Sequence, residues 1–156
     1  MNHKKYPVQI SLLLLLLFSF FSQAAETVSQ ADSDAARIQM LEKALAPETP
    51  KAVASLFAKA NKTRNGAVQF MMFSDQLKTK YQNEWPYWVS GTSSPWITSY
   101  TIDTIAQKVN VWQFRITYQW ATASGPFQPP LLQTITVEPA SKDSNSSQTF
   151  WITHLE

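Results

Sequence analysis

Apolar residues in the first half of the chain recur at the three- and four-residue spacing of an α-helix. Ile38, Leu41 and Leu45 share one face of a predicted first helix, with Asp34 as its N-cap. Pro47 ends this helix, because a proline cannot continue helical hydrogen bonding. The pattern predicts an amphipathic helix at the start of the folded domain.

A second helix is predicted to begin at Thr49-Pro50, an N-cap residue followed by proline at the first helical position. Its apolar face consists of Val53, Leu56, Phe57 and Ala60. Asn65-Gly66 interrupts the pattern, and residues 67–73 form a short apolar helix. Ser74 caps a further turn, in which Leu77 and Tyr81 share a face. The first half of the chain is therefore predicted to be helical.

The second half of the chain changes to a period of two, which is typical of strands. The predicted strands are Trp96–Ile105, Val109–Ala121, Leu131–Glu138 and Gln148–Leu155. Along the second strand one face holds Trp112, Phe114, Ile116, Tyr118 and Trp120, and the other holds Gln113, Arg115, Thr117 and Gln119. Predicted links are residues 85–95, the turn-rich stretch from Ser124-Gly125-Pro126 to Pro129-Pro130, and a polar loop at 139–147. Helices followed by consecutive strands predict an α+β domain whose antiparallel sheet curls around the helices.

The N-terminus has the organisation of a secretory signal. A basic start containing Lys4 and Lys5 precedes the run Leu12–Phe21, which is apolar except for Ser19, and small residues follow up to Ala25. The apolar run is shorter than the ~20 residues that a spanning helix needs. We predict a cleaved signal at residues 1–25, a flexible leader at 26–33 and one domain at 34–156. An uncleaved membrane anchor is the alternative for the first segment.

Composition narrows the possible functions. The chain has 13 Lys and Arg, of which Lys4 and Lys5 lie in the signal, so 11 remain against 11 Asp and Glu. The mature chain therefore has no excess of positive charge that would attract nucleic acid or an anionic membrane. There is no Cys, which excludes disulfides, thiolate metal sites and a lipid-anchored cysteine. The acids are scattered without metal-ligand spacing, and we expect neither a metal nor a cofactor.

Two motifs resemble a known family. The stretch Arg64–Phe70 followed by Ser74–Leu77, and then Trp88–Trp96, resembles a small nuclear transport factor 2-like (cystatin-like) domain of exported Gram-positive bacterial proteins. Similar segments follow the metallopeptidases that sense antibiotics in the penicillinase-repressor system. The resemblance implies a cone, with helices in the concave face of a curved sheet. No His-Glu-x-x-His motif exists in the chain, so no protease role is implied.

Candidates for catalysis are few. His154 is the only histidine outside the predicted signal. Enzymes of this superfamily pair His or Asp with Tyr to move a proton, which makes His154, Asp103 and Tyr100 the candidates if they meet inside the cone. General acid–base catalysis requires such groups within about 3 Å of the transferred proton. The simpler interpretation of His154, at a strand end, is a surface residue.

Candidates for binding are aromatic residues and one arginine. Trp85, Tyr87, Trp88 and Trp96 gather around the loop between helices and strands. Such aromatics form either an exposed contact patch or a plug at one end of the cone. Arg115 either anchors an anionic ligand or lies on a solvated face beside an acid.

The sequence therefore favours an exported, non-enzymatic domain that binds an envelope protein or a small ligand. A homodimer through the sheet is a further possible assembly. The alternative is a small cofactor-free isomerase or dehydratase with a pocket inside the cone. The two differ in whether titratable groups or packed aromatic rings fill the interior.

Overall fold

The computed structural model describes residues 29–83, 85, 94–141 and 148–156. The chain divides into two compact units, residues 1–34 and 35–156. Of the first unit, only residues 29–34 are described, and residues 30–34 form the beginning of α1 (Gln30–Leu45). The second unit continues α1 and contains the other helices, α2 (Pro50–Lys62), α3 (Gly66–Met71) and α4 (Asp75–Tyr81). Its strands are β1 (Trp96–Lys108), β2 (Val111–Thr122), β3 (Gly125–Pro139) and β4 (Phe150–Leu155).

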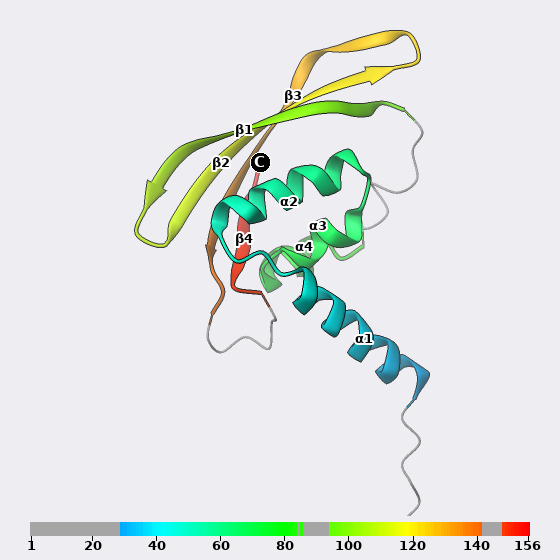
Figure 1. Cartoon of the computed structure of the whole chain (residues 1–156), viewed down its shortest axis with the longest axis vertical. Helices are drawn as coiled ribbons and strands as arrows, with labels where there is room; N and C mark the ends of the chain where they lie inside the picture. Colours follow the sequence, from blue (N-terminus) through cyan, green and yellow to red (C-terminus); the bar gives the residue numbers. More distant parts are fainter. Residues whose placement is uncertain (1–28, 84, 86–93, 142–147) are drawn as a thin grey trace, which may run out of the picture. The chain divides into compact units, whose positions relative to one another are not determined.

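The described strands form one antiparallel sheet in the order β1-β2-β3-β4, so each strand pairs with its neighbour in the chain. Figure 1 shows α2 lying along one face of this sheet, and α2 contacts all four strands. We call the face that packs on α2 the inner face and the opposite one the outer face. The predicted α+β class is confirmed.

Short-range signals set the helix starts. The Thr49 hydroxyl accepts a hydrogen bond from the Ala52 N–H, and Pro50 is the first residue of α2, as predicted. Asn65 caps α3 and Ser74 caps α4 through side-chain acceptors. Ser74 is also fixed to the sheet, because its N–H donates to the Ile152 carbonyl at 2.9 Å.

The first helix differs from its prediction in two respects. It begins before Asp34, because Ser29 accepts a hydrogen bond from the Asp32 N–H and donates to its carboxylate. Its predicted apolar face stays exposed at Ile38, Leu41 and Leu45. Amphipathic spacing therefore predicted the helix correctly but not its burial. No helix in the described part of the chain is long and apolar enough to span a membrane.

The core lies between α2 and the inner face. Val53, Phe57 and Ala60 of α2 are buried, as predicted, and Leu77 of α4 is buried with them. From β2 the core receives Phe114, Ile116 and Tyr118. The other two residues of the predicted apolar face differ from these. Trp112 is partly buried against the core, whereas Trp120 lies outside it and contacts Phe127 instead.

One predicted link proved to be part of a strand. β3 begins at Gly125 and runs through Pro129 and Pro130, with Phe127 opposite Trp120. Prolines are tolerated here because β4 pairs only with the far end of β3, from Ile135 onwards, which leaves this stretch at a sheet edge. Conversely, Val109 is not the start of a strand but lies in the turn between β1 and β2.

Candidate functional site

Packed side chains fill the space between α2 and the inner face of the sheet in the described part of the chain. Tyr118, Ile116 and Phe114 of β2 are at most 2% exposed, and Val53 and Phe57 of α2 are fully buried against the same core. Such packing leaves little free volume in a protein interior. These side chains are buried from solvent in this structure.

Tyr118 is a titratable residue buried in this interior. Its hydroxyl donates to Gln133 Oε1 at 3.2 Å, and its ring meets that of Tyr100 edge-on. Burial raises the pKa of Tyr118 well above the ordinary value, although a hydrogen bond with Asn61 opposes part of the shift. The tyrosine is therefore held neutral and acts as a buried anchor between strands β2 and β3.

The three candidates for proton transfer do not come together. Tyr100 lies on the inner face, where its ring centroid is 6.2 Å from that of Tyr118. Asp103 is exposed on β1, opposite Arg115 of β2, and His154 is exposed on β4. Strands β1 and β4 are the two edges of the sheet, so Asp103 and His154 are separated by β2 and β3. His154 Nε2 instead contacts Glu156 Oε1 at 2.9 Å.

The aromatic residues of the loop divide between the core and the surface. Trp85 packs against Phe57, Phe73 and Tyr81, and its indole N–H donates to Gln69 Oε1 at 3.1 Å. Trp85 is therefore partly buried against the core. Trp96 is 39% exposed at the start of β1. Tyr87 and Trp88 lie outside the described residues.

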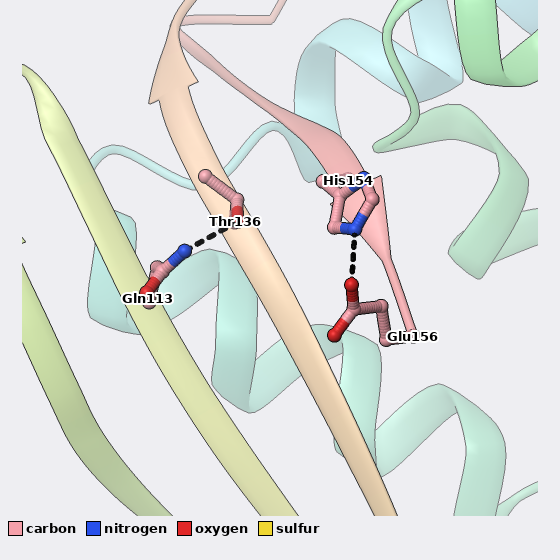
Figure 2. Close-up of polar contacts among 4 residues, drawn as sticks. All are labelled: Gln113, Thr136, His154 and Glu156. Carbon is pink, nitrogen blue, oxygen red and sulfur yellow. Dashed lines mark hydrogen bonds and ion pairs between the residues drawn. The ribbon is translucent and has the colours of Figure 1, made fainter.

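The outer face carries polar side chains in cross-strand rows. One row is Asp103, Arg115 and Thr134, from β1, β2 and β3 in register. The next row is Thr101, Thr117 and Leu132. A third row is Gln113, Thr136 and His154, in which Gln113 Nε2 donates to Thr136 Oγ1 at 3.4 Å (Figure 2). The helices appear behind the ribbon in this view, so these side chains project from the uncovered side of the sheet.

Arg115 is the basic residue at the centre of this face. It is exposed, with Asp103 across from it on one side and Thr134 on the other. Trp96 also lies on the outer face, because its neighbour Ile97 packs inward against the core. Trp96 stands opposite Ala121, and the stretch from Ala121 to Arg115 spans roughly 20 Å at the usual strand rise. This separation is too long for both residues to hold one small ligand.

The sequence did not reveal the buried polar residue Gln69. It is fully buried in α3, where Nε2 donates to the Phe57 carbonyl and Oε1 accepts from Trp85. One feature of the sequence could have identified it, namely a single polar residue inside an otherwise apolar helix. Such a residue indicates a buried amide whose hydrogen bonds are made within the protein. The role of Gln69 is to join α2, α3 and the segment after α4.

Neither a metal site nor a similarity to known proteins assigns a function to the described part of the chain. Within residues 29–83, 85, 94–141 and 148–156 no cluster of three or more His, Asp or Glu side chains is placed to hold a metal ion. Comparisons of the chain with protein-family models, with curated proteins and with solved structures find no match. The function must therefore be argued from the surfaces of the chain itself.

Proposed function

We propose that this chain is an exported, non-enzymatic binding domain that uses the outer face of its sheet to hold a protein partner at the cell envelope. The observation that carries the proposal is the contrast between the two faces. The inner face is occupied by packed side chains, whereas the outer face presents Arg115, Thr101 and Gln119 uncovered in the described structure. The partner is a protein rather than a small ligand, because the exposed positions extend over roughly 20 Å of the sheet.

We also propose the nuclear transport factor 2-like cone as the fold type. Helices followed by consecutive antiparallel strands, with α2 laid across the sheet, agree with that arrangement. Export rests on the charged, apolar and small-residue order of residues 1–25. The isomerase alternative receives no support from the interior, where Tyr118 is fully buried and bonded to Gln133.

Site-directed photocrosslinking tests the proposal cleanly, because the chain has no Cys and a single introduced Cys is a unique attachment point. A photoreactive group on Thr101→Cys would lie on the outer face, and the same group on Lys59→Cys would lie on the exposed side of α2. We expect a discrete protein adduct in intact cells from Thr101→Cys and none from Lys59→Cys. Adducts of equal yield from both positions, or from α2 alone, would place the partner elsewhere and contradict the proposal.

A further inference from the structure

The edges of the sheet differ in whether a further strand can join them. At the β4 edge the Ile152 N–H donates to the Met72 carbonyl at 2.8 Å, and the Ile152 carbonyl accepts from the Ser74 N–H at 2.9 Å. The part of β3 that β4 does not reach contains three prolines, which have no N–H for a further strand. Strand β1 contains no proline, and within the described structure it pairs only with β2. Its other side therefore presents backbone groups that a strand of another chain can bond.

The last part of β1 and the turn that follows it are open to solvent. Every residue from Asp103 to Asn110 except Ala106 is exposed. Two of them are apolar, namely Ile105, which is 40% exposed, and Val109, which is 90% exposed. Figure 1 shows the β1–β2 hairpin at the left, extending beyond the start of α2. Apolar side chains beside an unpaired strand edge favour association with another chain.

The two charged residues of β1, Asp103 and Lys108, have opposite signs and lie on one face of the sheet. Residues five apart on a regular strand point to opposite faces. Strand β1 is not regular here, because the extra residue Ile105 has no partner in register on β2. The partners of the two charged residues are Arg115 and Val111, which are four apart on β2 and therefore share the outer face. The irregularity at Ile105 thus brings both charges to the outer face.

This arrangement of charges makes the β1 edge complementary to itself. If two copies pair antiparallel with Asp103 of one opposite Lys108 of the other, two-fold symmetry creates the same charge pair a second time. In that register Ile105 of each copy stands opposite Ala106 of the other, which covers part of its exposed surface. Opposite charges on one face of neighbouring strands attract each other. The self-complementarity favours a second copy of this chain over an unrelated strand.

We propose that the chain forms a homodimer through its β1 edges, with Asp103 of each copy opposite Lys108 of the other. Asp103 then lies between two basic side chains, Arg115 of its own chain and Lys108 of the other copy. Because the facing charges lie on the outer face in both copies, the two outer faces join on the same side of one continuous sheet. The dimer therefore doubles the outer face without covering it.

Sedimentation velocity of the purified protein over a range of concentrations measures the association. Lys108→Asp and Asp103→Lys each turn both facing pairs into pairs of like charge, so each variant should weaken the homodimer roughly tenfold or more. When the two variants are mixed in equal amounts, every facing pair is attractive again. We expect the mixture to form a heterodimer with most of the original affinity, which a merely structural effect of the substitutions would not produce.

Lys59→Asp is the matched control, because it makes the same change of charge on the exposed side of α2 and should leave the association unaltered. Circular dichroism confirms that each variant is folded. Lys108→Asp is the safer of the two, since Lys108 faces Val111 and not a charge within its own sheet. A monomer at every concentration, an equal loss with Lys59→Asp, or a mixture that associates no better than its components would overturn the proposal. The outer-face function is tested separately, because this assay contains no partner protein.

Discussion

The hydrogen bond between Gln69 and Trp85 gives the sharpest stability prediction. Gln69 is fully buried, and its amide joins the Phe57 carbonyl of α2 to the Trp85 indole. In Gln69→Leu the partly buried indole N–H loses its bond to Gln69, which costs up to about 1–3 kcal/mol. The Phe57 carbonyl lies inside α2 and keeps its helical partner, so it contributes less to the loss.

The reverse substitution, Trp85→Phe, leaves the Gln69 oxygen without its donor and costs a similar amount in addition to the lost ring area. When both are replaced, neither polar group remains to be satisfied. We therefore expect the double variant to be less destabilised than the two single changes together, with a coupling of about 1 kcal/mol or more.

Urea unfolding followed by far-ultraviolet circular dichroism would measure the free energies of unfolding for the four proteins of this cycle. The control cycle pairs Gln69→Leu with Trp112→Phe, because Trp112 packs on Phe150 and makes no bond to Gln69 among the described contacts. The control should be additive within about 0.5 kcal/mol. Additivity in the Trp85 cycle as well would refute the hydrogen bond between Trp85 and Gln69.

Three further predictions concern the core, the pH dependence of stability and the N-terminus. Phe114→Ala should lower the free energy of unfolding by about 3–5 kcal/mol, and Trp120→Ala by clearly less, since only Phe114 is core; equal losses in denaturant titrations would contradict the assignment of faces. Because Tyr118 ionises near its ordinary pKa of 10.0 only when unfolded, stability should fall as pH rises above that value, by about 1.4 kcal/mol per pH unit. Tyr118→Phe should remove that part of the slope, and an unchanged slope would argue against burial. N-terminal sequencing of exported protein should find Ala25 or Glu26 first, whereas intact Met1 in the membrane fraction would favour an anchor.

The sequence predicted the parts of the fold that depend on local chemistry. Thr49-Pro50 and Ser74 are strong helix starts because their side chains satisfy nearby N–H groups whatever the tertiary structure. The alternation along β2 correctly assigned Phe114, Ile116 and Tyr118 to the buried face. Apolar residues alternate along a strand when only one of its faces is covered, and here the helices cover that face.

The errors have a common physical cause. An apolar pattern in the sequence does not show how far the surface that covers it extends. Trp120 continues the alternation of β2 but lies beyond the core, so it pairs with Phe127 instead of joining the core. Ile38 and Leu41 have helical spacing without a described surface that buries them. Pro129 and Pro130 indicate a loop by composition, yet the open edge of β3 tolerates them.

The candidate site was predicted only in part, for the same reason. Arg115 was expected either to bind a ligand or to lie on a solvated face beside an acid, and Asp103 does stand opposite it on that face. The proposed meeting of Asp103, Tyr100 and His154 failed because it depends on strand order and on which face each side chain takes. Neither can be obtained from the spacing of three residues in separate strands.

Chemical accessibility of the outer face in living cells tests the central claim most directly. Thr101→Cys is the probe and Lys59→Cys the reference, each the only thiol in its protein, and both original residues are exposed. In the purified protein a maleimide should label both positions at similar rates. If a partner covers the outer face at the envelope, labelling of Thr101→Cys in intact cells should be much slower than that of Lys59→Cys, and full-rate labelling should return on purification. Equal rates at the two positions in intact cells would contradict the account, because the outer face would then be open to solvent where it is proposed to be occupied.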